Sequence, residues 1–323
     1  MTKPPEIVFI YNPVFLNKHP GIRLTDVLEK IRRFGFSVKA FPMQQEEAWK
    51  DDPGFLLQDA AALVVAGGDG SLNMAVNALL ASSNEKALSP MPPIGIIPWG
   101  TANDFAGYLG GGQAYTLEQL LQSIAGRKLL PVDVGQVNGS YFMNVAGGGL
   151  LVDIAHKTSV TLKKKMGMLA YYLEGARKFS LYRPFPLYLK TGSFEEEMEV
   201  YLFLVLNSKT AGGFRQIAPH ASINDGKLDI VIIKKTSPIP GLLNIFAKAL
   251  EGKHLHDPYI LYLQADQLEL HGPAALETDI DGEKGPSFPL SFRVLRRRLQ
   301  FYYIDSSLLQ YDNSGSTVTD YPA

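Results

Sequence analysis

The chain has 323 residues, of which 46% are hydrophobic and 20% charged, and its formal net charge is −1. This balance predicts a globular protein of two domains, and it excludes a global positive field that would draw the chain to nucleic acid. Cysteine is absent, which excludes disulfides and thiolate metal sites. The longest apolar runs, such as Ala60–Ala66 and Tyr201–Leu206, are shorter than the ~20 residues of a membrane-spanning helix. We therefore expect a cytoplasmic protein without a transmembrane segment.

Strand and helix patterns alternate in the first part of the chain, residues 1–131. Short apolar runs predict buried strands at Ile7–Tyr11, Ser37–Phe41, Ala61–Ala66 and Ile94–Ile97. Helical spacing predicts helices at Leu24–Phe34, Ser71–Leu80 and Thr116–Ile124. Ser71 is the expected N-cap of the second helix, and Asn12-Pro13 predicts a turn. The alternation favours an α/β domain with a doubly wound parallel sheet and helices on both faces.

From about Pro131 the pattern changes to strands joined by Gly, Asn or Asp turns. The predicted strands are Val132–Val137, Tyr141–Val145, Leu187–Thr191, Glu197–Leu206, Leu228–Ile233, Tyr259–Gln264, Gln267–His271 and Phe288–Leu295. Two predicted helices, Lys165–Phe179 and Ile239–Leu250, interrupt them. Residues 132–298 are therefore expected to form a β-rich domain, a sandwich or a barrel-like pair of sheets. The segment around 299–310 is a candidate to complete the first domain, and polar residues 311–323 predict a loose tail.

The strongest local motif is Gly67-Gly68-Asp69-Gly70-Ser71, between a predicted strand and a predicted helix. Glycines there let the main chain approach an anion, and the first N–H groups of the helix point at it. Asp69 cannot bind phosphate directly because like charges repel, so we expect it to act through Mg²⁺ or water. The alternative is a plain strand-to-helix turn. The motif matches neither the Walker loop nor GxGxxG.

The second motif, PWGTANDF, begins at Pro98 directly after the next strand. Ends of neighbouring parallel strands open on one edge of a sheet, so this loop and GGDGS are expected to line one crevice. Thr101 can cap a helix, and Asn103 and Asp104 can lie over a metal or hold the loop. Trp99 can stack on adenine or fill an interface between domains, and the second interpretation is favoured.

Two Asp-Gly motifs lie in the second part of the chain. Asp281-Gly282-Glu283 lies between two strand-like runs, and Asn224-Asp225-Gly226 precedes another. Taken alone, each is typical of a hairpin turn. The six histidines show no metal spacing, and His254 and His256 are expected in loops. Arg296-Arg297-Arg298 predicts a charge cluster at a strand end rather than a nucleic-acid site.

The order of the four motifs resembles the diacylglycerol kinase catalytic-domain family. This family includes the bacterial YegS-type lipid kinases and, more distantly, sphingosine and ceramide kinases, and phosphofructokinases and NAD kinases share part of the first loop. The resemblance runs from about Ile7 to Leu299. Further matching segments are Val132–Gly135, Phe142–Asn144, Gly147–Gly149, Gly212–Phe214 and Ala218–Ala221. The resemblance implies an ATP-dependent, Mg²⁺-using lipid kinase whose acceptor is diacylglycerol, phosphatidylglycerol or a sphingoid-like lipid.

The resemblance also implies roles for individual residues. Asp281 and Glu283 would be the catalytic carboxylates, one of which takes the proton from the lipid hydroxyl. Asp225 would bind Mg²⁺ with the carbonyls of Ser222 and Lys227. Asp69, Asp104 and Asp133 would form an acidic, water-linked network around the active-site metal. The nucleotide would contact Asn12, Gly67, Gly68, Asp69, Gly70, Ser71, Leu72, Asn73, Gly100 and Thr101.

The chain departs from the family pattern at a few positions. Ser71 stands where Thr is usual, Met74 stands where Glu is usual, and Val14-Phe15 replaces a small Ser-Gly pair. No threonine is found near Phe41, at the end of the second strand, where relatives contact the nucleotide. The DGE carboxylates are unaffected by these changes.

The expected partner is a lipid at the membrane surface, contacted peripherally, and the family allows a homodimer through the first domain. The segment 157–178 places basic residues beside apolar ones, which suits either an anionic membrane surface or a solvated helix packed on the second domain. Two other functions stay open. One is a kinase of a small soluble substrate, and the other is a non-catalytic lipid-binding protein on a kinase fold.

Overall fold

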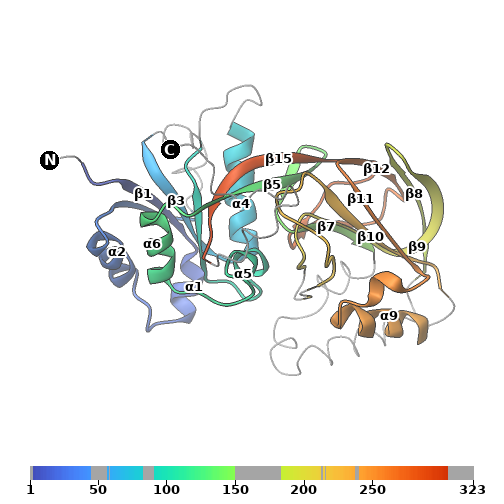
Figure 1. Cartoon of the computed structure of the whole chain (residues 1–323), viewed down its shortest axis with the longest axis horizontal. Helices are drawn as coiled ribbons and strands as arrows, with labels where there is room; N and C mark the ends of the chain where they lie inside the picture. The colour runs from blue at the N-terminus through green and yellow to red at the C-terminus, as the bar shows by residue number, and fades with distance from the viewer. Residues whose placement is uncertain are drawn as a thin grey trace. The chain divides into compact units, whose positions relative to one another are not determined.

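The computed structural model describes residues 3–44, 57, 59–82, 91–149, 183–211, 214, 216–236 and 240–304. The chain divides into two compact units, Met1–Val134 with Arg296–Ala323, and Gly135–Leu295. Two strands, β5 (Leu129–Val137) and β15 (Leu290–Tyr302), contribute residues to both units (Figure 1). The predicted helix Lys165–Phe179 lies outside the described residues.

The first unit is built on a parallel sheet with the strand order β15-β4-β3-β1-β2. All four neighbouring pairs in this order are parallel. The inner strands are almost wholly buried, which explains why their sequences are unbroken apolar runs. The strands that precede β5 are β1 (Glu6–Tyr11), β2 (Ser37–Pro42), β3 (Ala60–Gly67) and β4 (Ile94–Pro98).

Helices pack on this sheet, α2 on β2, α4 on β3 and α6 on β4. The helices of the unit are α1 (Pro13–Lys18), α2 (Leu24–Arg33), α4 (Asp69–Ser82), α5 (Asp104–Leu109) and α6 (Leu117–Ala125). Thr116 caps α6 in a capping box with Gln119. The turn predicted at Asn12-Pro13 is instead a helix start, with Asn12 as N-cap and Pro13 as the first helical residue. Ser71 lies inside α4 and is not its N-cap, so that prediction is wrong.

The second unit is mostly antiparallel. Its strands follow the order β14-β13-β7-β9-β8-β12-β15, and β10 joins β9 to β11, while β6 pairs with β5. The bounds are β6 (Ser140–Phe142), β7 (Val145–Gly149), β8 (Phe185–Thr191), β9 (Glu195–Leu206), β10 (Leu228–Lys234), β11 (Ile260–Ala265), β12 (Gln267–His271), β13 (Thr278–Ile280) and β14 (Glu283–Lys284). The predicted fold class, a parallel α/β domain followed by a β-rich domain, is confirmed.

Strands β9 and β10 carry the core of the second unit, because both of their faces are buried. Val200, Phe203 and Val205 of β9 belong to one hydrophobic cluster, whereas Leu202 and Leu204 belong to another. Helix α9 (Pro240–Leu250) adds Ile245 and Ala249 to the second cluster. This explains why the sequence of β9 is apolar without alternation towards its end.

Two predictions about charged and polar residues are wrong. Strand β15 continues to Tyr302, so Arg296-Arg297-Arg298 lies within the strand and not at its end. His254 is not a loop residue, because it lies in the short 3₁₀ helix His254–His256 and is only 1% exposed. Its Nε2 lies 2.8 Å from the carbonyl oxygen of Ile217, and its Nδ1 is buried without a hydrogen-bond partner among the described residues.

The buried position of His254 predicts a loss of stability in mild acid. Burial lowers the pKa of His254 below its usual value, and the hydrogen bond to the Ile217 carbonyl opposes this only in part. The unfolded chain therefore takes up the proton first as the pH falls below about 6.5. The free energy of unfolding should then fall by up to about 1.4 kcal/mol per pH unit.

Chemical denaturation at a series of pH values measures this contribution. His254→Gln keeps a donor for the Ile217 carbonyl and removes the titration, so its stability should depend less on pH between about 5 and 7. Equal pH dependence of the two proteins would contradict the prediction. His271→Gln, an exposed histidine on β12, serves as the control.

Candidate active site

The GGDGS motif joins β3 to α4 with a single residue, Gly68, between the two elements. The helix begins at Asp69, so Gly70, Ser71, Leu72 and Asn73 form its first turns. The N–H groups of a first helical turn have no acceptor within the helix, and the helix dipole makes this end positive. The start of α4 can therefore bind an anion such as a phosphate group.

Asp69 connects this loop to the next one. Its two carboxylate oxygens accept hydrogen bonds from the N–H groups of Asp104 and Phe105, each at 3.1 Å. These residues begin α5, so a carboxylate from another loop caps that helix. The predicted cap Thr101 is exposed, and the helix starts after Asn103 instead. The acidic residue in the glycine loop thus has a structural reason that needs neither metal nor water.

The two loops touch through glycines. A Cβ added to Gly100 would lie 2.3 Å from the Cα of Gly68, and one added to Gly68 would lie 3.0 Å from the Cα of Gly100. The N–H of Trp99 donates to the carbonyl of Gly67 at 2.9 Å. Because the obstructing atoms are main-chain atoms, neither glycine can carry a side chain without moving a loop.

Asn103 shapes the second loop. It has a left-handed conformation with φ of 53°, which asparagine tolerates better than most residues. Its Oδ1 accepts from the N–H of Gly100 at 2.8 Å, and its Nδ2 donates to the Gly100 carbonyl at 2.9 Å. Asn103 therefore holds the loop, which was one of the two roles expected for it.

Asn12 and its neighbours form the third segment at this edge of the sheet. The N–H of Asn12 donates to the carbonyl of Ala66 at 2.9 Å, and its side chain accepts from the N–H of Val14. Phe15 stacks on Trp99 with ring centroids 4.9 Å apart and planes at 8°. His19 stacks on Phe15 with a separation of 4.1 Å. The large Phe15 thus packs against the still larger Trp99.

Asp133 is fully buried and accepts a hydrogen bond from the N–H of Arg297, which has φ of 47°. Like Asp69, it accepts a hydrogen bond from main chain far away in the sequence. Within the described part of the chain, no group of three or more acidic or histidine side chains gathers as a metal site. Asp69 and Asp104 lie next to each other in the two loops, Asp133 lies on β5, and the water-linked metal network expected of the three stays a prediction.

In the second unit, Asp281 is bound by three consecutive main-chain N–H groups. Its Oδ2 accepts from Met143 at 2.7 Å, and its Oδ1 accepts from Asn144 and Val145, both at 2.9 Å. The N–H of Asp281 in turn donates to the Val145 carbonyl at 2.9 Å. Successive N–H groups of this kind form an anion-binding concavity. The Asp281 carboxylate is therefore held rigidly.

Glu283 is different. It begins β14 opposite Ile280, its side chain is exposed, and its carboxylate has no hydrogen-bond or ion-pair partner among the described residues. Asp281 and Gly282 form the turn between β13 and β14, with φ of 50° and 94°. The hairpin therefore combines a fixed carboxylate with an unbonded one two residues away.

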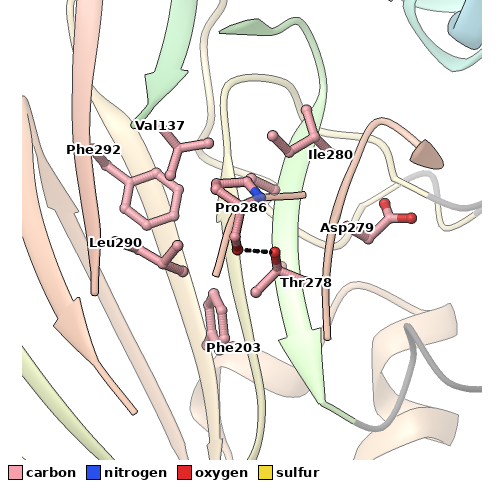
Figure 2. A pocket seen from close by; sticks show the side chains of 10 residues that line it. Val137, Phe203, Thr278, Asp279, Ile280, Pro286, Leu290 and Phe292 are labelled. Atoms are coloured by element: carbon pink, nitrogen blue, oxygen red, sulfur yellow. Dashed lines mark hydrogen bonds between the residues drawn. The ribbon is translucent and has the colours of Figure 1, made fainter. Parts of the chain in front are cut away.

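A narrow apolar recess, with no room for a water molecule, lies beside β13 in the same unit (Figure 2). Thr278 and Pro286 close part of it through a hydrogen bond from the Thr278 hydroxyl to the Pro286 carbonyl. Asp279 lies on the opposite side from the large apolar side chains. The apolar side chains that line it are Val137, Phe203, Ile280, Leu290 and Phe292.

The Asn224-Asp225-Gly226 turn was the predicted Mg²⁺ site. Asp225 accepts from the N–H of Lys227 at 3.0 Å, as in a tight turn. Asp229 follows on β10, is fully buried and accepts from the Tyr262 hydroxyl and from Gln264. Its other oxygen, Oδ2, is buried without a hydrogen-bond partner in the described chain.

Burial raises the pKa of Asp229 to about 6, and the charge of Asp225 adds to the rise, while the bonds from Tyr262 and Gln264 oppose it. Two carboxylates with an unsatisfied buried oxygen are the oxygen donors that Mg²⁺ prefers. The residues of this turn therefore fit a cation of that kind.

Comparison with known proteins agrees with the two-unit architecture. Residues 6–137 match the family described as the diacylglycerol kinase catalytic domain, and residues 149–303 match the YegS C-terminal NAD kinase beta sandwich-like domain. The chain is 33% identical to a diacylglycerol kinase of Bacillus subtilis (strain 168) over 291 residues, 90% of this chain and 93% of that protein.

The chain belongs to the diacylglycerol kinase family.

A second member of the family, from Staphylococcus haemolyticus (strain JCSC1435), is 30% identical over 296 residues, 90% of this chain and 86% of the relative. A crystal structure described as a diacylglycerol kinase from Bacillus anthracis str. Sterne superimposes with a TM-score of 0.71 at 24% identity. It covers 95% of this chain and 100% of the other, which shows that the fold is shared.

Two observations bear on the predicted contact with a membrane. No helix in the described ranges combines the length and apolar character of a membrane span. The basic and apolar segment 157–178 and the glycine pair Gly212-Gly213 lie outside those ranges. Lipid contact therefore stays a prediction for this diacylglycerol kinase family member.

The contact between Gly68 and Gly100 predicts that Gly100→Ala disrupts the phosphate loop. We expect a loss of roughly 1–3 kcal/mol in stability, the usual cost of overpacking, and weaker ATP binding. Thermal unfolding and isothermal titration with ATP measure the two effects. Gly107→Ala on α5 is the matched control, because its added Cβ meets nothing within 4 Å. That control should gain roughly 0.5–1 kcal/mol. An unchanged Gly100→Ala would show that the loops are not in contact.

Proposed function

We propose that this chain transfers the γ-phosphoryl group of ATP to a lipid hydroxyl, with diacylglycerol as the first acceptor to test. The observation that carries the proposal is the Asp281–Glu283 hairpin, which presents a fixed carboxylate and an unbonded one in a member of the diacylglycerol kinase family. The two relatives from Bacillus subtilis and Staphylococcus haemolyticus are named diacylglycerol kinases, which supports this acceptor.

Phosphoryl transfer needs a group that holds phosphates and a base for the acceptor hydroxyl. The first unit offers the start of α4, where main-chain N–H groups and the helix dipole favour phosphate. Asp69 supports this site indirectly, because its hydrogen bonds to the N–H groups of Asp104 and Phe105 hold the PWGTAND loop against the glycine loop. Asn12, Gly100 and Thr101 border the same loops and stay candidate nucleotide contacts.

The second unit offers the base. We propose that Glu283 accepts the proton of the lipid hydroxyl, because its carboxylate can take up a proton without losing a hydrogen bond to the described residues. The acceptor oxygen forms a bond to the γ-phosphorus, the bond from phosphorus to the ADP oxygen breaks, and the hydroxyl proton moves to Glu283 and then to solvent. Asp281 keeps its three N–H donors and fixes the hairpin.

Mg²⁺, when bound, supplies charge neutralisation for the phosphates. Asp225, the carbonyls of Ser222 and Lys227, and the buried Asp229 are the residues we propose to hold one ion. Because a lipid acceptor resides in a bilayer, we also propose peripheral membrane contact from the cytoplasmic side.

The direct test is transfer of label from γ-labelled ATP to diacylglycerol, phosphatidylglycerol and a sphingoid base in mixed micelles with Mg²⁺. Labelled diacylglycerol is the expected product. Labelling of another lipid would show that this lipid, and not diacylglycerol, is the acceptor of the same phosphoryl transfer. ATP binding without any labelled lipid would favour a soluble acceptor, and no ATP binding would favour a non-catalytic lipid-binding protein.

Neutralising Glu283 and neutralising Asp281 should have different effects on kcat and on stability. Glu283→Gln should lower kcat by roughly 10²–10⁴-fold, because it removes the base, and leave the melting temperature unchanged because the side chain is exposed. Asp281→Asn should lower kcat and also cost roughly 1–3 kcal/mol of stability, because the three N–H donors lose a charged acceptor.

Steady-state kinetics and thermal unfolding of both variants check this contrast. Glu277→Gln, an exposed carboxylate just before β13, is the control and should retain full kcat and stability. Full turnover by Glu283→Gln would show that Glu283 is not the base.

A further inference from the structure

The segment Met143–Val145 has all six of its main-chain polar groups paired. Its three N–H groups donate to the carboxylate of Asp281. Its three carbonyls accept from the Asp281 N–H, from the Asn207 N–H and from the Asn207 side chain. All of these partners belong to two residues that are far away in the sequence, Asp281 and Asn207.

Asn207 controls both peptide groups that donate to Oδ1 of Asp281. A peptide unit is planar, so fixing its carbonyl fixes the direction of its N–H. The Met143 carbonyl accepts from Asn207 Nδ2 at 3.1 Å, and the N–H of the same peptide unit belongs to Asn144. The Asn144 carbonyl accepts from the Asn207 N–H at 2.9 Å, and that unit ends in the N–H of Val145.

Of the two hydrogen bonds from Asn207, a substitution can remove only the one from its side chain, because every residue except proline keeps the main-chain N–H. Asn207 follows β9 directly, one residue after Leu206, which pairs with Val145. Its side chain is fully buried, and Asn207 Nδ2 is the partner of the Met143 carbonyl within the described residues. Without that amide, the Met143 carbonyl would be left unpaired, and its peptide unit would be held on one side only, by the bond from the Asn144 N–H to Asp281.

Ser208 provides the comparison. It is also fully buried, and its hydroxyl lies within hydrogen-bond distance of the Asn144 side-chain oxygen and of the Thr210 carbonyl. It contacts neither of the two carbonyls that set the direction of the donors to Asp281. A substitution here tests burial and polarity without touching the peptide units.

We propose that Asn207 is a positioning residue for catalysis: it orients the Asn144 and Val145 N–H groups that hold the Asp281 carboxylate and, through the turn, the Glu283 hairpin. The catalytic part of this inference rests on the function proposed above. The structural part does not, because it concerns only the orientation of two amides.

The experiment compares Asn207→Leu, which has the same number and branching of side-chain heavy atoms but no donor, with Ser208→Ala. Hydrogen exchange resolved at single amides should be faster at Asn144 in Asn207→Leu by about tenfold or more, and less affected at Val145, whose peptide unit keeps its bond from the Asn207 main chain. With diacylglycerol in mixed micelles, kcat should fall by about 10- to 100-fold, since small misplacements cost this much. The KM for ATP should stay within about twofold of the wild type, because the phosphate loop belongs to the other unit.

Ser208→Ala should leave exchange at the two amides, and kcat, within about twofold of the wild type. If Asn207→Leu does not fold, Asn207→Ser gives a milder loss of the amide and the same measurements apply. Unchanged exchange at Asn144 would overturn the inference, and so would faster exchange with full kcat. A wild-type protein that labels no lipid would contradict the proposed function, and the exchange measurement would still decide whether Asn207 holds the amides.

Discussion

Aspartate carboxylates that accept main-chain N–H groups hold the functional loops of both units in place. Asp69 binds the first two N–H groups of α5, and Asp281 binds three in succession after β6. Asp133 does the same for Arg297. Bonds to a charged acceptor are stronger than neutral ones, and an unpaired buried N–H is costly, so each aspartate specifies one loop conformation.

The glycine motifs follow from this constraint. When Asp69 caps α5, it draws the PWGTAND loop onto the glycine loop until Gly68 and Gly100 touch. A side chain at Gly100 would push the two loops apart, and one at Gly68 would press against the main chain of Gly100. GGDGS and GTAND are therefore two halves of one packed structure, and each needs the other's glycine. The start of α4, where we propose that phosphate binds, is consequently held in one shape by contacts within the protein.

The sequence was sufficient to predict β1 to β4, because their burial appears directly as apolar runs. Strands β13 and β14 were not predicted, β15 was expected to end at Leu295, and the predicted strand Tyr141–Val145 is two strands, β6 and β7. Helix starts were less predictable. Ser71 and Thr101 have the residue types of N-caps, but the true cap of α5 is Asp69, which lies 35 residues away from Asp104. The anchoring of Asp281 spans 136 to 138 residues. Asn207 was not singled out at all, since a polar residue after a strand is common in loops. Motif resemblance could identify the carboxylates but not the main-chain groups that position them.

The Asp281-Gly282-Glu283 motif shows why a turn and a catalytic site are not competing interpretations. The hairpin needs two residues with positive φ, and Asp-Gly supplies them at low cost. Asparagine would suit the turn equally, but its amide donates on one side, whereas three N–H groups require a side chain that only accepts. The positive φ values of the turn therefore favour an Asp-Gly pair, and the three N–H donors favour Asp over Asn. The carboxylate of Asp281 uses its oxygens to hold the hairpin. Glu283, which begins the next strand, has a carboxylate without a hydrogen-bond or ion-pair partner in the part of the chain that the structure describes. A group free of structural bonds, on a rigidly held hairpin, is the better candidate for a proton acceptor, because protonating it leaves the hairpin intact.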